Sequence, residues 1–287
     1  MGIFDWLLGK PRKLGNEAAP GLNRGDRSKI DTLTRPALHL VQAGNETFSR
    51  LGGLPVVPAD FVWPQWKEQP LAFLGQLSMA ELAPSFPPDL LLARTGYLYF
   101  FYDQRQSTWG FDPEDRGSWR VIYVEGDPRD FVSAAKPVGL SEEVSPQKHL
   151  AGIPIRTFPG WFDDSIGALK LNESLMDGYF EMASAAYGGK PMHQMGGVAQ
   201  AVQSNDMDLQ CQLVSHGIYC GDPSGYNDPR VAGLEAGASD WHLLLQIDSD
   251  EEAGMMWGDV GILFFWIKKE DLRNRNFDAV WMVLQCS

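Results

Sequence analysis

The sequence predicts an α+β fold, rich in antiparallel sheet, in which a strand–short helix–strand unit occurs twice. Gln76 and Gln246 each stand in the middle of an apolar run that is typical of a strand. A glycine follows each glutamine, 20 residues later at Gly96 and 15 residues later at Gly261, and each glycine opens an aromatic strand. Two such units cannot each bury an apolar face alone. We therefore expect them to pack as pseudo-symmetric mates in one body, with a cleft between them.

The boundaries of the two copies follow from where these patterns begin and end. The copies span about residues 36–125 and 190–287. Each also has two adjacent glycines upstream of its glutamine, at positions 52 and 53 and at positions 196 and 197. The second copy carries an insertion rich in Gly, Asp and Asn around residues 203–240. Residues 31–287 are therefore predicted to form a single domain of two repeats.

The first 30 residues differ in composition from this domain. A short amphipathic segment comes first, and residues 10–30 are then rich in Gly, Pro, Asn, Lys and Arg without apolar periodicity. Such a composition cannot offset the entropy of ordering the chain, so we expect a flexible tether here.

The first copy is predicted to contain four strands, each a short apolar or alternating run. They lie at residues 36–41, 71–77, 97–102 and 119–124. Ser78 and Glu81 form a capping box, which predicts a short helix that ends near Pro84. The clearest helix lies between the copies, where apolar residues recur at helical spacing over residues 172–187 and Gly188 follows.

The composition is that of a folded protein without a membrane span. Apolar residues make up 44% and charged residues 21% of the chain, and the longest apolar run, residues 260–267, is too short to cross a bilayer. Three cysteines are too few for a disulfide framework, and the N-terminus lacks the features of a signal peptide. We therefore expect a cytoplasmic location.

The chain is acidic, with a net charge of −13. Most of the excess lies in residues 171–287, which carry 17 acidic and 6 basic side chains. This charge argues against nucleic acid and anionic membranes as partners, because both require a positive protein surface. It is compatible with a basic protein partner, and also with a solvated face that keeps the protein soluble.

Several motifs spread over residues 30–287 point together to one family. In the first part of the chain they are Gly52-Gly53-x-Pro55, Trp63-Pro64, Pro70-Leu71-x-Phe73-Leu74-x-Gln76-Leu77 and Gly96-x-Leu98-x-Phe100-Phe101. Further along they are His193-Gln194-x-x-Gly197, Leu243-Leu244-Leu245-Gln246-x-Asp248-Ser249-Asp250, Trp257-Gly258-Asp259-x-Gly261 and Phe265-Trp266-Ile267-x-x-x-Asp271-Leu272. With these motifs the sequence resembles the YwqG-like family, a bacterial domain of unknown function. The resemblance implies an α+β fold with internal duplication, and it brings no established activity.

The motifs of known enzymes, such as the nucleophile elbow, the Walker A loop and the dinucleotide-binding glycines, do not occur in the sequence. Cys211, His216 and Cys220 lack the close cysteine pair of a structural zinc site. The acidic run at 248–259 approaches a calcium-loop spacing, but it has Ala253 where the sharp turn requires glycine. We therefore expect no metal and no cofactor, while a weak cation site in this run stays an alternative.

The candidate binding residues gather around the two glutamine strands. Gln246 and Asp248 lie two apart on one strand and so share a face, and the turn at Trp257 and Asp259 leads into the next strand. We expect these four to form one wall of the cleft. The opposite wall is predicted to hold Gln76, Trp63 and His193. In the alternative interpretation the glutamines are structural, and each buried amide bonds to backbone.

The sequence favours a binding or interaction protein over an enzyme. One concrete form is a protein that neutralises a basic toxin domain by covering its cationic site with an acidic face, and a small ligand is another. The alternative is a hydrolase of unknown substrate, in which Asp259, Asp248 and His193 act as acid and base in the inter-repeat cleft.

Overall fold

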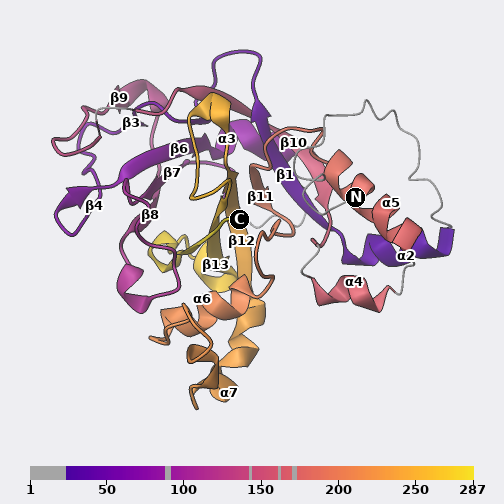
Figure 1. Cartoon of the computed structure of the whole chain (residues 1–287). Helices are drawn as coiled ribbons and strands as arrows, with labels where there is room; N and C mark the ends of the chain where they lie inside the picture. The colour runs from indigo at the N-terminus through magenta and orange to yellow at the C-terminus, as the bar shows by residue number, and fades with distance from the viewer. Residues whose placement is uncertain (1–23, 88–91, 142–143, 161–162, 170–172) are drawn as a thin grey trace.

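The computed structural model describes residues 24–87, 92–141, 144–160, 163–169 and 173–287. Its main feature is a ten-stranded sheet (Figure 1). β1 (Arg35–Gln42) and β10 (Lys148–Thr157) pair antiparallel at the centre of this sheet. The fold is therefore α+β with a large antiparallel sheet, as predicted.

Four further strands flank the central pair on each side. On the β10 side they are β2 (Arg50–Leu51), β6 (Ala72–Ser78), β7 (Tyr97–Tyr102) and β8 (Trp119–Val124). On the β1 side they are β11 (Gln194–Gly196), β12 (Trp241–Asp248), β13 (Ile262–Lys268) and β14 (Trp281–Gln285). We call the strands from β10 to β8 the first half of the sheet and those from β1 to β14 the second half.

The two central strands are exchanged relative to chain order. β1 precedes β2 in the chain but pairs with β10 and β11. β10 precedes β11 in the chain but pairs with β1 and β2. The first half of the sheet therefore contains β10, which follows β8 in the chain, and the second half contains β1, which precedes every strand of the first half.

The two halves also share local features. The β6–β7 ladder shifts register just before Gln76, and the β12–β13 ladder shifts register just before Gln246. Such an irregularity bends a strand and increases its twist. Two adjacent glycines in the left-handed region follow β2 (φ 64° and 71°), and two more end β11 (φ 66° and 77°). The chain therefore turns away from the sheet in a similar manner in both halves.

The helices at residues 24–33, 164–168 and 173–185 lie to one side of the sheet (Figure 1), whereas those at residues 79–82 and 207–215 supply buried side chains to the core. The bounds of the helices are α2 (Arg24–Leu33), α3 (Met79–Leu82), α4 (Asp164–Ala168), α5 (Glu173–Ala185), α6 (Met207–Ser215), α7 (Val231–Leu234) and α8 (Lys269–Arg273). Two small ladders join β3 (Val56–Val57) to β9 (Val132–Ser133) and β4 (Gln65–Trp66) to β5 (Gln69–Pro70). Among the described residues, no helix combines the length and the apolar character that crossing a membrane requires.

Several predicted elements are confirmed. β7 and β8 begin and end at the predicted residues, and α5 falls within the predicted helix at 172–187. Only half of the predicted capping box forms: the Ser78 hydroxyl accepts a hydrogen bond from the Glu81 N–H at 3.4 Å, while the Glu81 carboxylate accepts from the N–H groups of Phe48 and Ser49 instead of Ser78. The short helix that it begins ends at Leu82.

The last residues of the predicted tether are instead helical. α2 occupies residues 24–33, and Ile30 is buried in a small cluster with Ile166 and Tyr179. The prediction rested on the average composition of residues 10–30, which does not reveal that a single apolar side chain packs against distant residues. This part of the prediction is therefore wrong. Residues 1–23, with the amphipathic segment and the rest of the tether, lie outside the described residues.

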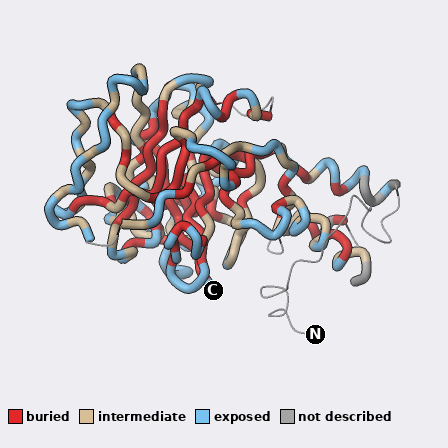
Figure 2. Tube along the Cα trace, turned by 90° about the horizontal axis from the view of Figure 1, so that it is seen from above, coloured by how far each residue is buried: buried red, intermediate tan, exposed pale blue. Residues whose placement is uncertain are grey.

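The largest core cluster lies between the two halves of the sheet. It includes Leu77 and Phe100 from the first half and Ile247 and Phe265 from the second. The rings of Phe100 and Phe265 meet edge to face at 5.3 Å. Figure 2 shows the buried stretches gathered in the strands, with exposed loops around them. Burying each such aromatic side chain contributes roughly 2 kcal/mol, so this contact joins the halves firmly.

The sheet curls until its two edge strands approach each other. The Trp119 indole N–H, in β8, donates to the carbonyl of Val280, just before β14, at 2.9 Å. The Trp119 and Trp281 rings lie 4.9 Å apart. At the other end of β14, the Leu284 N–H donates to the carbonyl of Trp109 at 3.0 Å. Loops of both halves therefore meet along β14.

Candidate functional site

The two glutamines are fully buried and bond to backbone. The Gln76 Oε1 accepts from the Val56 N–H at 2.8 Å, and its Nε2 donates to the Phe48 carbonyl at 2.9 Å. In the second half, the Gln246 Oε1 accepts from the N–H of residue 200 at 2.9 Å, and its Nε2 donates to the Met192 carbonyl at 2.8 Å. Both ends of each amide are therefore occupied, which confirms the structural interpretation of the glutamines.

A buried charge cluster lies beside Gln246, where β10, β11 and the end of β12 meet. The Lys148 ammonium donates to the Asp250 carboxylate at 2.7 Å and to the Glu252 carboxylate at 3.0 Å. The His193 Nε2 lies 3.1 Å from the same Asp250 oxygen. Lys148, His193 and Asp250 are all buried, whereas Glu252 is exposed. This ion cluster ties the central strand β10 to the second half of the sheet.

The hydrogen bonds of His193 define which of its ring nitrogens carries the proton. The backbone N–H of Asp248 can only donate, and it points at the His193 Nδ1 at 3.1 Å. Nδ1 is therefore the acceptor, so the neutral ring carries its proton on Nε2 and donates to Asp250. Both nitrogens are used inside the protein, and neither is available to a substrate.

The carboxylates of Asp248 and Asp250 have opposite pKa shifts. Burial raises the pKa of Asp248, and the hydrogen bond from the Met192 N–H only partly offsets this. Burial acts the same way on Asp250, but hydrogen bonds from His193 and Lys148 and the positive charge of Lys148 outweigh it and hold the pKa of Asp250 well below its usual range. Although burial opposes it, the hydrogen bonds to Asp250 and Glu252 raise the pKa of Lys148. The cluster is thus a stabilised ionic group.

The other predicted site residues lie in three different places. The Trp257 indole N–H donates to the Asp248 carbonyl at 3.2 Å, so this side chain packs beside the charge cluster. Asp259 is exposed, and its carbonyl accepts from the Ser287 N–H at 3.1 Å. Trp63 lies in the first half, where its N–H donates to the Leu71 carbonyl at 2.9 Å.

Gln246, Asp248, His193 and Trp257 are thus neighbours, and His193 lies beside Asp248 instead of facing it from another wall. Lys148 was missed, because β10 carries a glycine and a proline that argue against a strand. Among the described residues, no group of three or more His, Cys, Asp and Glu side chains is arranged to hold a metal ion.

An exposed surface forms where loops of the two halves meet. The Gln106 side chain, from the loop after β7, donates to the Met256 carbonyl at 2.9 Å and accepts from the Gly258 N–H at 3.1 Å. Trp109 on one loop is 37% exposed, and on the other Met256 is 44% and Val260 58% exposed. We call the set Gln106, Trp109, Met256, Asp259 and Val260 the junction surface.

Two backbone positions of the junction surface are strained. Gln106 has φ 51° and Val260 has φ 49°, both in the left-handed region. A β-branched residue with this φ is an outlier, and holding it costs of order 1–3 kcal/mol. Glycine would adopt the same φ without this cost.

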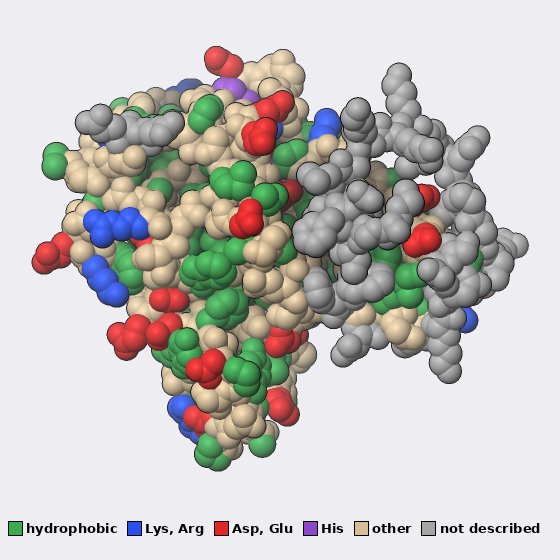
Figure 3. All heavy atoms as spheres, in the orientation of Figure 1, with side chains coloured by type: hydrophobic (Ala, Val, Ile, Leu, Met, Phe, Trp, Pro, Cys, Tyr) green, Lys and Arg blue, Asp and Glu red, His purple; other side chains and the backbone are tan. Residues whose placement is uncertain are grey.

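The loop that supplies most of the junction surface is acidic. Residues 248–260 contain five Asp and Glu residues and no Lys or Arg. On the facing loop, the positive charge of Arg105 and the negative charge of Asp103 cancel. On the face drawn in Figure 3, hydrophobic side chains and carboxylates lie together around the middle of the molecule, and Lys and Arg lie mostly toward the margins. Exposed apolar side chains with acidic neighbours suit a basic polypeptide.

Residues 49–286 match the family described as Domain of unknown function (DUF1963). The chain belongs to the DUF1963 family. The match contains every strand of the sheet except β1, together with the charge cluster and the junction surface. No curated protein matches this DUF1963 chain.

Proposed function

We propose that this DUF1963 protein is a binding protein whose partner is a basic polypeptide, and that the junction surface is where the partner binds. The observation that carries the proposal is Val260, a β-branched side chain that is exposed although its backbone is strained. Strain that packing does not require is found preferentially at functional sites. Because the strained backbone at Val260 lowers the stability of the fold, we infer that the Val260 side chain serves binding.

The charge around Val260 supports a basic partner. Asp259 is exposed beside it, and Glu251 is exposed on the same acidic loop. Lys and Arg side chains of the partner pair with these carboxylates, while an apolar side chain covers Trp109, Met256 and Val260. A basic toxin domain that the protein neutralises is one partner of this chemistry.

The geometry gives the hydrolase alternative less support. His193 is buried, and both of its ring nitrogens bond to protein groups. The Asp248 carboxylate accepts the Met192 N–H, and Asp259 is exposed at the far end of the loop. A general base must reach the proton that it removes, and in this arrangement His193 has no free nitrogen to do so.

A peptide titration tests the proposal. The probes are a 16-residue peptide of alternating Lys and Leu pairs and the same peptide with Glu in place of Lys. Binding of each peptide is measured by fluorescence anisotropy. We expect saturable binding of the Lys peptide, weakened by salt, and no binding of the Glu peptide. Val260→Gly should weaken binding about tenfold, the effect of losing one apolar contact, while the free energy of unfolding stays equal or rises because strain is relieved.

Val138→Gly is the matched control, since Val138 is fully exposed on another loop and the same atoms are removed. It should leave the affinity unchanged. Equal binding of the two peptides, no binding of either, or equal effects of the two glycine variants would contradict the proposal.

We further propose that the sheet arose by internal duplication of about residues 36–125 and 190–287 within one domain, as YwqG-like proteins are expected to be built. Matching register shifts, glycine pairs and glutamine hydrogen bonds support this. A cytoplasmic location is part of the same proposal and rests on the small number of cysteines.

A further inference from the structure

Met255 and Met256 are neighbours in the chain with opposite exposure. Met255 is 4% exposed, and its N–H and C=O both bond to the backbone of Asp250, at 2.9 and 2.8 Å. The Met256 side chain is 44% exposed. Among the described residues, no other methionine is exposed. The junction surface therefore holds the most accessible methionine of the described chain.

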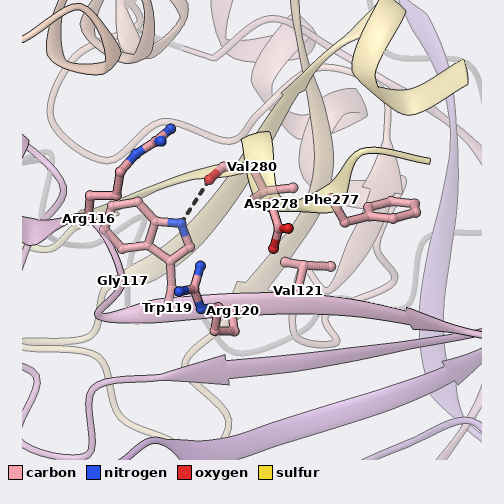
Figure 4. A pocket seen from close by; sticks show the side chains of 8 residues that line it. All are labelled: Arg116, Gly117, Trp119, Arg120, Val121, Phe277, Asp278 and Val280. Atoms are coloured by element: carbon pink, nitrogen blue, oxygen red, sulfur yellow. Dashed lines mark hydrogen bonds between the residues drawn. The ribbon is translucent and has the colours of Figure 1, made fainter. Parts of the chain in front are cut away.

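The exposure of Met256 is a fixed feature of the fold, because the groups around it are held in place. The Met256 carbonyl accepts from the Gln106 side chain at 2.9 Å, and the next residue, Trp257, is buried. At the other end of β14, the Trp119 indole N–H donates to the Val280 carbonyl, as the dashed line in Figure 4 shows, so the two halves are joined there as well. Turning Met256 inward would require breaking the contacts that hold its loop.

An exposed thioether is open to oxidation by peroxides. The sulfur lone pair attacks the O–O bond of hydrogen peroxide, so that an S–O bond forms and the O–O bond breaks. The thioether is oxidised to a sulfoxide. The peroxide is reduced, and its second oxygen takes up the proton of the transferred hydroxyl and leaves as water. The product is a polar side chain in place of a flexible apolar one.

We propose that Met256 is an oxidation site through which peroxide lowers the affinity of the junction surface for its partner. The inference rests on the proposed function, because it names a regulation of the same surface. Met256 is exposed together with Trp109 and Val260, where an apolar side chain of the partner is expected to pack. A sulfoxide at this place would lose hydration when the partner covers it, and that opposes binding.

Peroxide treatment followed by tandem mass spectrometry tests the oxidation site without any peptide. In the folded protein we expect Met256 to gain one oxygen atom about tenfold faster than Met255 or more, because oxidation follows exposure. In urea-unfolded protein the two neighbours should be oxidised at similar rates. Similar rates in the folded protein would overturn the oxidation site, whatever the protein binds.

The effect on binding is measured with the Lys peptide before and after peroxide. Oxidation should weaken binding to the natural protein about fivefold, the effect of losing part of an apolar contact. Met256→Leu has no sulfur at this position, so its affinity after peroxide should equal its own affinity before treatment. Met182→Leu is the matched control, since Met182 is half-buried in another cluster, and this variant should respond to peroxide like the natural protein.

The outcomes separate this inference from the proposed function. If peroxide weakens binding to Met256→Leu as much as to the natural protein, or if complete oxidation of Met256 leaves the affinity unchanged, the regulation is overturned and the binding surface stands. If the untreated protein does not bind the Lys peptide, the proposed function and its regulation both fail, and the oxidation rates alone decide whether Met256 is a modification site.

Discussion

Asp248 and Asp250 show how two carboxylates two residues apart can have opposite effects on stability. Asp250 lies between a lysine and a histidine, and its charge is what holds the cluster together. Asp248 is largely buried, and among the described residues its carboxylate accepts a backbone N–H but no hydrogen bond from a basic side chain. The same residue type is therefore stabilising at one position and costly at the other.

Asp250→Asn is expected to lower the free energy of unfolding by about 3 kcal/mol, because it leaves the buried Lys148 ammonium with only the exposed Glu252. Asp248→Asn should change it by less than about 1 kcal/mol or raise it, since an amide oxygen can still accept the Met192 N–H. Urea unfolding at pH 7 measures both. Equal losses in the two variants would contradict this account of the cluster.

The pH dependence follows from the same two shifts. The pKa of Asp250 is depressed in the folded state, so its contribution is present above its unfolded pKa of about 4 and is lost as pH falls through the folded value. The pKa of Asp248 is raised in the folded state, so its ionisation lowers the free energy of unfolding as pH rises from the unfolded pKa of about 4 through the folded-state pKa. Between pH 5 and 2, urea midpoints should fall less steeply in Asp250→Asn than in the natural protein. An unchanged slope would argue against a depressed pKa at Asp250.

At this scale the sequence predicted some contacts and not others. The backbone bonding of Gln76 and Gln246 agrees with the alternative interpretation of these glutamines, in which a buried amide must find partners, and not with their predicted place as binding residues. His193 and Asp248 were both predicted to lie at one site, but on opposite walls of a cleft, whereas in the structure they are hydrogen-bonded neighbours. Lys148 could not be found, because its position depends on a strand that pairs with distant parts of the chain.

The strands and their glutamines are the elements that shape both halves. Gln76→Leu leaves the Val56 N–H and the Phe48 carbonyl unpaired, and Gln246→Leu leaves the equivalent groups unpaired in the second half. Each unsatisfied buried group costs about 1–3 kcal/mol. We therefore expect both variants to lose about 2 kcal/mol or more, and by similar amounts, in urea unfolding. A large loss in one variant alone would show that the two amides have different roles.

β10 explains why the middle of the sheet was hard to predict. The strand contains Gly152 and Pro154, which usually mark a break. A Cβ at Gly152 would lie 2.8 Å from the Leu38 side chain, so close packing on β1 requires glycine here. β2 pairs with only Lys148 and His149 of β10, so Pro154 lies beyond that ladder, where its missing N–H does no harm. By contrast, the aromatic strand β7 was predicted residue for residue, because its composition alone identifies it.

The exchange of β1 and β10 is a property of the whole molecule that no local pattern reveals. A fragment of residues 31–135 has β1 without its neighbours β10 and β11, and β2 without β10. We expect this fragment to be unfolded by circular dichroism and by amide shift dispersion. The matched control is residues 24–287, which keeps every described strand and should fold like the full chain. A cooperative unfolding transition in the short fragment would show that the halves are independent.

We propose that loops of the two halves create one binding surface for a basic polypeptide. Amide shift mapping with the Lys/Leu peptide and the labelled full-length protein tests this proposal. We predict that the shift changes gather at residues 105–110, 255–260 and 284–287, where the loops meet along β14. Changes spread over the acidic surface, or gathered at α6 and α7 while these three segments stay unchanged, would contradict the claim.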